Sequence, residues 1–309
     1  MPKIFIALST FAQEGLQPLQ ALEAGGLPFE INATGKRLTK KQVMGALGDF
    51  DGVVAGLEPY DAEVLNALPR LKCISRCGAG VDNVDAAVAK TKGIAVLNTP
   101  DVVVQPVAEM TLALMFDCLR QVAWHAALMR QGRWERAAGR QLAGKTAGII
   151  GLGRIGRRVA ELLVRLDVGV VGFDVAPDRS WAKLSGVKLL DLKGLLGCSD
   201  IVTLHLSADI KSPLCLSKDE FARMKPGALL INTSRGSFVD EEALAQVLRS
   251  GHLSGAGLDV YRQEPYNGPL CHVPNVVLTP HVSTLTKESR LAMETEAVEN
   301  IVQYFKKKL

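Results

Sequence analysis

Three short polar segments in the second half of the sequence each follow an apolar run, and they carry Arg235, Glu264 and His281. An arginine held at a strand end can form a bidentate pair with a carboxylate and polarise a neighbouring carbonyl. A glutamate bonded to one imidazole nitrogen fixes the tautomer, and the other nitrogen can then give or take a proton. Taken singly, a loop arginine and a histidine after Pro280 are more often structural. Together the three residues predict proton transfer on a substrate that bears a carboxylate.

A glycine-rich turn precedes these segments. Gly151, Gly153 and Gly156 lie between an apolar run at 146–150 and a helical pattern at 157–166, and Asp174 ends the next apolar run. Such a turn brings backbone N–H groups to a pyrophosphate, and the later carboxylate accepts hydrogen bonds from ribose hydroxyls and repels a 2′-phosphate. A tight corner without a ligand is the alternative. The full context favours dinucleotide binding, with NAD preferred over NADP.

Short apolar runs alternate with helical patterns on both sides of a long apolar helix predicted at 107–121. Alternation of this kind builds parallel sheets with helices on both faces. We therefore expect two doubly wound α/β domains. The predicted strands are 4–8, 29–32, 52–55, 72–75 and 95–98, and then 146–150, 169–174, 200–205, 228–233, 255–260 and 276–279; the predicted helices include 16–24, 40–47, 62–68, 85–90 and a last one at about 287–307.

The composition restricts the class of protein. The chain has 309 residues, 48% apolar and 22% charged residues, and a net charge of +4. This charge is too small to indicate a nucleic-acid partner, and no apolar run is long enough to span a bilayer. The N-terminal apolar run has no cleavage site typical of a signal peptide, and the six cysteines do not have zinc-ligand spacing. We expect a cytoplasmic protein with free thiols and no metal.

The order of these motifs is similar to that of the D-isomer-specific 2-hydroxyacid dehydrogenases. Within that family, residues 76–85, 132–136 and 286–288 resemble the phosphoglycerate dehydrogenase branch. The resemblance covers essentially the whole chain. It implies a Rossmann NAD-binding domain at residues 100–283, inserted into a flavodoxin-like substrate domain at 1–99 and 284–309. We expect the short form of the family, without a C-terminal regulatory domain.

The resemblance also implies a role for each matching residue. Arg235 would bind the substrate carboxylate and carbonyl, His281 would be the acid/base and Glu264 its partner. The domains of the family close on a substrate held from the other side by Arg76, Gly78, Ala79 and Gly80. The NAD contacts would come from Gly151, Gly153, Arg154, Ile155, Gly156, Asp174, His205, Leu206, Ser207, Thr233, Ser234, Asp259 and Ser283.

The sequence departs from the phosphoglycerate dehydrogenase pattern in three places. Residues 55–59 replace an Arg-Ser-x-Thr stretch that helps to hold a substrate phosphate, and Glu58 has the opposite charge preference. Arg76 remains as an anion ligand or as part of a structural ion pair. Residues 102–109 are more apolar than the family pattern, and Ser207 replaces a common proline. These departures leave the phosphorylation state of the substrate open.

The predicted activity is the NAD-dependent interconversion of a D-2-hydroxy acid and its 2-keto acid, most like that of D-3-phosphoglycerate dehydrogenase. A glyoxylate or hydroxypyruvate reductase is the alternative enzyme. An NAD-sensing corepressor is the alternative of another class, since such proteins can keep Arg235, Glu264 and His281. By resemblance, the helix at 107–121 and the arm at 124–134 imply a homodimer.

Overall fold

The computed structural model describes residues 1–207 and 214–307 of the chain. The chain forms two compact units. Unit 1 comprises Met1–Val103 and Thr284–Leu309, and unit 2 comprises Val104–Ser283. The sequence placed this division at residues 99 and 100, whereas Val104 begins the first helix of unit 2. Residues 308 and 309, which were included in the predicted substrate domain, lie outside the described residues.

Unit 1 contains a five-stranded parallel sheet in the order β2-β1-β3-β4-β5. This is the flavodoxin-like order, as predicted. Its strands are β1 (Ile4–Ile6), β2 (Phe29–Ile31), β3 (Gly52–Ala55), β4 (Cys73–Arg76) and β5 (Ala95–Leu97).

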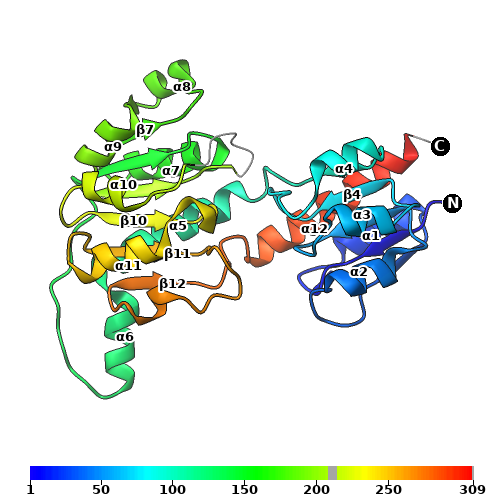
Figure 1. The fold of residues 1–309 in the computed structure, drawn as a ribbon, viewed down its shortest axis with the longest axis horizontal. Coiled ribbons are helices and arrows are strands. Elements are labelled where there is room, and N and C mark those ends of the chain that lie inside the picture. Colours follow the sequence, from blue (N-terminus) through cyan, green and yellow to red (C-terminus); the bar gives the residue numbers. More distant parts are fainter. Residues whose placement is uncertain (208–213, 308–309) are drawn as a thin grey trace. The chain divides into compact units, whose positions relative to one another are not determined.

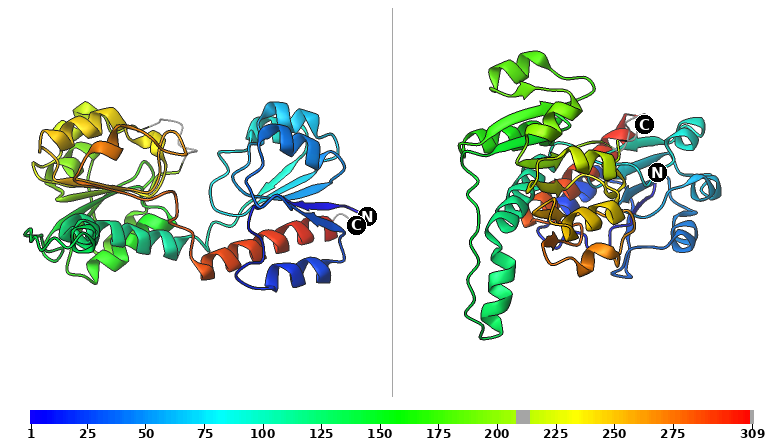
Figure 2. Two further views of the ribbon diagram at one scale, coloured as in Figure 1. Left: turned by 90° about the horizontal axis from the view of Figure 1, so that it is seen from below. Right: turned by 60° about the vertical axis from the view of Figure 1, so that its left-hand side comes forward.

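Helices cover both faces of this sheet (Figure 1). One face packs on a cluster of apolar side chains that includes Val43, Leu65 and Ile74. The last helix packs beside the first, as Figure 2 shows, and the Ser75 hydroxyl donates a hydrogen bond of 2.6 Å to Ala297 O on it. The end of the chain therefore completes the unit that the N-terminus begins. The helices are α1 (Gln17–Gly25), α2 (Lys40–Leu47), α3 (Ala62–Ala67), α4 (Ala86–Thr91) and α12 (Lys287–Lys306).

Unit 2 contains a seven-stranded parallel sheet in the order β12-β11-β10-β9-β6-β7-β8. The order reverses between β9 and β6, as in the Rossmann fold, and ligands bind such sheets outside the carboxyl ends of the strands. The strand β8 was missed from the sequence because it has only two residues and Lys188 is exposed. The strands are β6 (Thr146–Ile150), β7 (Gly169–Phe173), β8 (Lys188–Leu189), β9 (Ile201–Leu204), β10 (Leu229–Asn232), β11 (Gly255–Leu258) and β12 (Val276–Leu278).

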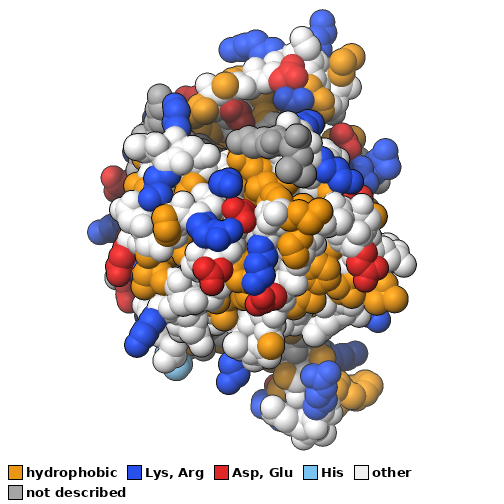
Figure 3. All heavy atoms as spheres, turned by 90° about the vertical axis from the view of Figure 1, so that its right-hand side faces the viewer, with side chains coloured by type: hydrophobic (Ala, Val, Ile, Leu, Met, Phe, Trp, Pro, Cys, Tyr) orange, Lys and Arg blue, Asp and Glu red, His pale blue; other side chains and the backbone are white. Residues whose placement is uncertain are grey.

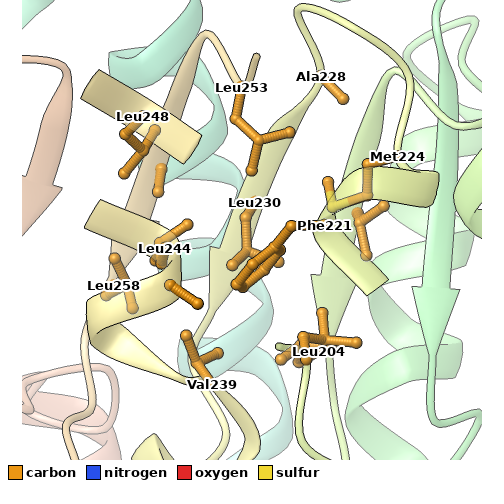
Figure 4. Packing of buried hydrophobic residues seen from close by; sticks show 14 of the residues in the cluster. Leu204, Phe221, Met224, Ala228, Leu230, Val239, Leu244, Leu248, Leu253 and Leu258 are labelled. Carbon is orange, nitrogen blue, oxygen red and sulfur yellow. The ribbon is translucent and has the colours of Figure 1, made fainter. Parts of the chain in front are cut away.

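Two apolar clusters lie on the two faces of the unit 2 sheet. On one face, Phe221 and Leu244 pack over Leu204, Leu230 and Leu258 of the central strands (Figure 4). On the other face, Met115 and Val159 pack over Ile149 and Ile231. The side chains of Asp178, Asp191 and Asp240 cap helix N-termini by accepting backbone N–H groups. The helices are α5 (Val104–Arg120), α6 (Val122–Arg130), α7 (Arg154–Val164), α8 (Arg179–Leu184), α9 (Leu192–Cys198), α10 (Lys218–Arg223) and α11 (Glu241–Arg249), with 3-10 turns η1 (Gly236–Phe238) and η2 (Pro269–His272).

The segment after α5 differs from its prediction. The arm at 124–134 was predicted without a helix, but residues 122–130 form α6, and the exposed stretch that follows has no regular secondary structure. The helix and this stretch project from the sheet of unit 2 (Figures 1 and 2). Helix α5 begins three residues before its predicted start at 107, because Pro106 is tolerated in the first turn of a helix.

Charged side chains are interspersed on the surface. Basic and acidic groups alternate over the face shown in Figure 3, as expected from a net charge of +4 distributed through the sequence. No helix within residues 1–207 and 214–307 combines the length and apolar character needed to cross a membrane. In the same part of the chain, no cluster of His, Cys, Asp and Glu side chains could hold a metal ion.

Candidate active site

The turn at 151–156 connects β6 to α7 and contains three glycines with different surroundings. Gly151 has a φ of +96°, and a Cβ there would stand 2.4 Å from His205 O. A Cβ on Gly156 would stand 2.0 Å from Gly151 O, whereas no atom of the described residues lies within 4 Å of the equivalent point on Gly153. Two glycines are therefore required by close backbone contact, and the third faces open space at a helix N-terminus.

This open space fits the pyrophosphate of a dinucleotide. Gly153 is the N-cap of α7 and provides no side chain to satisfy the first N–H groups of the helix. Free N–H groups and the helix dipole bind phosphate oxygens. Arg154 and Ile155 occupy the first turn of α7, where they were predicted to contact the same phosphates.

Asp174 follows β7 and is attached to the glycine turn. Its Oδ2 accepts a hydrogen bond of 2.7 Å from Leu152 N, and its Oδ1 accepts one of 2.9 Å from Ala176 N. Each carboxylate oxygen has further lone pairs. These bonds therefore orient the group and leave it able to accept hydrogen bonds from ribose hydroxyls. The half-buried carboxylate lies beside the turn that it was predicted to serve.

His205 follows β9 beside the glycine turn. Its Nε2 lies 3.0 Å from Thr203 Oγ1, and its buried Nδ1 has no hydrogen-bond partner among the described residues. Burial lowers the pKa of His205 to about 3, so the imidazole is neutral near neutral pH. The next two predicted contacts differ in burial, because Leu206 is half-buried and Ser207 is exposed.

The predicted contacts after β10 are held by their neighbours. The hydroxyl of Thr233 lies 2.9 Å from that of Thr111 on α5, and Ser234 donates through both N–H and hydroxyl to Asn232 Oδ1. Asn232 Nδ2 in turn donates a hydrogen bond of 2.9 Å to Arg235 O. The loop that presents Arg235 is therefore fixed by its own side chains.

Arg235 and Glu264 are brought together by a glycine contact. A Cβ on Gly236 would stand 1.9 Å from Tyr261 C, so the loop after β10 packs directly on the backbone after β11. Tyr261 N donates to Glu264 Oε1 at 3.2 Å, and Arg235 Nη1 donates to Ser234 O at 2.7 Å. Two residues that are far apart in the sequence thus stand on adjacent loops at the carboxyl edge of one sheet.

His281 and Glu264 form the predicted pair. His281 Nδ1 lies 2.8 Å from Glu264 Oε2, and about a third of each side chain is exposed. The bond fixes the imidazole orientation and directs Nε2 away from the glutamate. His281 itself has a φ of +56°, in the left-handed region that a residue with a Cβ seldom adopts. A strained backbone position of this kind depends on support from its surroundings.

Asp259 provides that support. The side chain is fully buried, and its two oxygens accept four hydrogen bonds from the loop that carries His281. Thr279 Oγ1 and Val282 N donate to Oδ1, at 2.6 and 2.9 Å, and Ser283 N and Oγ donate to Oδ2. The sequence marked Asp259 and Ser283 as NAD contacts but did not predict that they bond to each other. The signal in the sequence was Thr279, which lies two residues before His281 and bonds to Asp259.

The predicted substrate residues lie in unit 1 at the carboxyl end of β4. Arg76 Nη1 donates to Cys77 O at 2.6 Å, and its guanidinium lies where a Cβ on Gly78 would be, only 1.4 Å away. Gly78 N donates to the buried Thr99 hydroxyl at 2.8 Å, and Ala79 O accepts from Asn98 at 2.6 Å. The N–H of Gly78 is thus already used within the unit, which the sequence did not predict.

Glu58 follows β3 and faces inward. Only 2% of the residue is exposed, and its Oε2 accepts a hydrogen bond of 2.8 Å from Gly56 N. Burial raises the pKa of Glu58, although the nearby Arg37 and Arg76 oppose this shift. Asn83 Nδ2 holds the same loop by donating to Gly56 O and Glu58 O. The Gly56 N–H is therefore already bonded to the Glu58 carboxylate and is not available to an external anion.

Comparisons with known proteins identify the family of the chain. Residues 112–283 match the model of the D-isomer specific 2-hydroxyacid dehydrogenase, NAD binding domain. The chain belongs to this family. Unit 2 is its NAD-binding Rossmann domain, and the family comprises NAD-dependent oxidoreductases.

The relatives of this chain have names that refer to different activities. The chain is 35% identical over 295 residues to a D-3-phosphoglycerate dehydrogenase of Archaeoglobus fulgidus, covering 94% of this chain and 55% of that protein. It is 36% identical to a hydroxypyruvate reductase of Thermotoga maritima, covering 88% and 90%. The chain thus spans about half the length of the phosphoglycerate dehydrogenases that it matches.

A solved structure shares the whole fold. The TT0316 protein of Thermus thermophilus is 35% identical, with a TM-score of 0.88 over 97% of this chain and 96% of that one. The predicted fold class, with its two parallel-sheet α/β domains, is confirmed.

Proposed function

We propose that this protein interconverts a D-2-hydroxy acid and its 2-keto acid with NAD. The observation that carries the proposal is the His281–Glu264 pair, at 2.8 Å, on the loops next to Arg235. These side chains follow β12, β11 and β10, which are adjacent strands of the domain with the glycine turn. The proposed base, His281, and the arginine proposed to bind the substrate carboxylate, Arg235, thus lie at the edge where open α/β sheets bind ligands.

In this proposal each residue has one task. Bound NAD⁺ would accept the hydride from the carbon that carries the hydroxyl group during oxidation, and NADH would supply it to the carbonyl carbon during reduction. Arg235 binds the substrate carboxylate and polarises the carbonyl. His281 Nε2 takes the hydroxyl proton during oxidation or returns it during reduction, while Glu264 stabilises the charged imidazole. Asp259 keeps the His281 loop in place through its four hydrogen bonds.

The proposed substrate contacts in unit 1 change slightly from the sequence prediction. Gly78 N is bonded to Thr99, so Ala79 N and Gly80 N are the donors proposed for the substrate carboxylate. Arg76 packs on this turn and favours an anion there.

His281→Gln tests the assignment of the acid/base. Turnover should fall by about 10² to 10⁴-fold, the usual contribution of general acid/base catalysis, while the dissociation constant for NADH stays within about twofold. His272→Gln is the matched control, because His272 is exposed in the same unit and lies in η2. Stopped-flow rates and NADH titration would measure both quantities, and full turnover by the His281 variant would refute the role.

The substrate is proposed to lack a phosphate. The observation that favours a glyoxylate or hydroxypyruvate reductase over a phosphoglycerate dehydrogenase is Glu58, whose buried carboxylate occupies Gly56 N. A second anion would meet repulsion there. Initial rates with NADH should be higher for hydroxypyruvate and glyoxylate than for phosphohydroxypyruvate. A preference for the phosphorylated acid would reverse this choice.

The same assays address the regulatory alternative. A protein that binds NADH but reduces none of these acids, or pyruvate, would support an NAD-sensing role. Retention of Arg235, Glu264 and His281 alone does not separate the two functions.

We also propose that the protein is a homodimer formed through the arm of unit 2. Apolar side chains on α6 and beside it are exposed, by 58% at Val122, 53% at Met129 and 78% at Trp134. A second copy of the arm would cover such a patch. Trp134→Glu should weaken the dimer at least about tenfold in light scattering, whereas Leu184→Glu, at an equally exposed apolar site on α8, should not. The cytoplasmic location stays a prediction.

A further inference from the structure

Arg157, in the first turns of α7, is held by three contacts in the NAD-binding domain. Its Nε donates a hydrogen bond of 2.9 Å to Leu152 O, and its Nη1 lies 3.2 Å from Asp178 Oδ2. Its guanidinium carbon lies 4.9 Å from the centroid of the Trp181 ring. None of the roles predicted from the sequence involves Arg157, Asp178 or Trp181.

These contacts tie the guanidinium to the same residue of the glycine turn as Asp174, the carboxylate proposed to face the ribose. Leu152 N donates to Asp174 Oδ2 at 2.7 Å, while Leu152 O accepts from Arg157 Nε. Both side chains are therefore bonded to the main-chain groups of one residue of the glycine turn. An arginine held on this turn is the kind of group that accommodates the 2′-phosphate of NADP.

Asp178 takes part in two interactions. It pairs with Arg157, and it caps α8 by accepting a hydrogen bond of 3.0 Å from Trp181 N. The Trp181 N–H and the Arg157 charge lower the pKa of Asp178, so the carboxylate is ionised at neutral pH. The cap holds the carboxylate on the side of Arg157, and the Trp181 ring packs against the guanidinium.

We propose that Asp178 is a second determinant of coenzyme choice, because its ion pair with Arg157 withholds the guanidinium from a 2′-phosphate. Asp174 repels the 2′-phosphate directly, and Asp178 neutralises the cation that would bind it. The proposal rests on the proposed binding of NAD by unit 2. It assigns a preference for NAD over NADP to two carboxylates, Asp174 and Asp178, rather than to Asp174 alone.

Asp178→Ser separates the charge from the cap, since a serine hydroxyl can also accept the Trp181 N–H. Titration calorimetry with NADH and NADPH gives the ratio of the two dissociation constants. In Asp178→Ser this ratio should shift about two- to fivefold toward NADPH at low salt, the effect of one partly exposed charge pair, and the shift should shrink as salt is added. When Asp178→Ser is introduced into the Arg157→Gln protein, it should no longer shift this ratio.

Asp191→Ser is the matched control. Asp191 caps the next helix, α9, by the same type of bond, at 2.8 Å to Gly194 N, and within the described part of the chain it forms no ion pair with Arg157. Its ratio should equal that of the unmodified protein. An unchanged ratio in Asp178→Ser, or a shift that persists without Arg157, would overturn the proposal. If the unmodified protein did not bind NADH, the proposed function would be refuted instead.

Discussion

Asp51 in unit 1 and Asp259 in unit 2 are both buried aspartates next to a parallel strand, but they stand at opposite ends of it. Asp51 precedes β3 and accepts hydrogen bonds from Lys3 N, Arg70 and Lys72. Asp259 follows β11 and accepts its bonds from the loop that carries His281. The first joins the amino ends of strands, and the second organises a loop at the carboxyl edge.

Unit 2 repeats the arrangement of Asp51 at its own amino edge. Asp200 precedes β9 and accepts from Thr146 N at 2.8 Å and Lys225 Nζ at 2.6 Å. The same chemical group therefore stabilises the fold at one end of a strand and, at the other, holds the loop that carries the proposed base. For Asp51, Asp200 and Asp259, the end of the strand at which the aspartate stands, and not the number of its hydrogen bonds, separates support of the fold from support of the proposed site.

The largest difference between the two units should come from their crowded glycines. Gly156→Ala in unit 2 places a Cβ 2.0 Å from Gly151 O, which is backbone and cannot move aside, so the free energy of unfolding should fall by about 3 kcal/mol or more. Gly52→Ala in unit 1 meets the ends of the Phe305, Ile301 and Ile4 side chains, at 2.7 to 3.0 Å, and should cost about 1 kcal/mol. Calorimetric unfolding measures both.

Gly153→Ala is the control within the same turn. No atom of the described residues lies within 4 Å of its Cβ, so the protein should fold as before, yet bind NADH more weakly because the methyl group enters the proposed phosphate space. Equal NADH affinity in this variant would contradict the placement of the pyrophosphate.

The two buried aspartates should respond differently to loss of their charge. Asp259→Asn replaces one acceptor oxygen by an amide that faces donors from the His281 loop, at about 1–3 kcal/mol for each group left unsatisfied. Because the loop carries the proposed base, kcat should fall about 10- to 100-fold, with a smaller change in NADH binding. Asp51→Asn should lower the unfolding free energy by a similar amount and leave kcat unchanged. A loss of kcat from Asp51→Asn would break the comparison.

The smallest expected effect is a difference in the acid sensitivity of the two units. Burial lowers the pKa of His205 to about 3, so the stability it contributes to unit 2 is present above about pH 6.5 and is lost as the pH falls. In unit 1, burial raises the pKa of Glu58 and of Glu294. Their contribution is present below about pH 4.3 and is lost as the pH rises through the folded pKa. Between pH 7 and 5, unit 2 should weaken while unit 1 does not.

Hydrogen exchange followed by mass spectrometry would resolve the two units separately, after correction for the intrinsic rate at each pH. His205→Gln should remove most of the decline in unit 2. His252→Gln, in the same unit, should leave the decline in place. Equal acid sensitivity of both units would show that these buried groups do not control it.

Below about pH 4, a further loss should involve both units. Burial alone would raise the pKa of Asp51 and of Asp200. Their hydrogen bonds to backbone and lysine outweigh this effect, so both pKa values lie below the usual value. Their contribution is present above about pH 3.9 and is lost as the pH falls through the folded value.

Local pattern was sufficient to predict most of the fold. Alternating apolar runs indicated the strand positions of both sheets, and turn residues separated them. The two-residue strand β8 and helix α6 were missed, because the first has no apolar run of its own and the second is exposed over most of its length. The substrate domain boundaries and the roles of the site residues stay predictions.

The sequence by itself determined which chemical groups this protein has at its strand ends, because strand and helix periods and glycine turns depend on neighbours along the chain. Only the tertiary structure decided what those groups face. Glu58 points inward to Gly56, Gly78 N bonds to Thr99, Asp259 holds the loop of His281, and Arg157 is paired with Asp178. Most of these contacts join residues that are far apart in sequence, and all depend on side-chain direction, which a linear pattern does not contain.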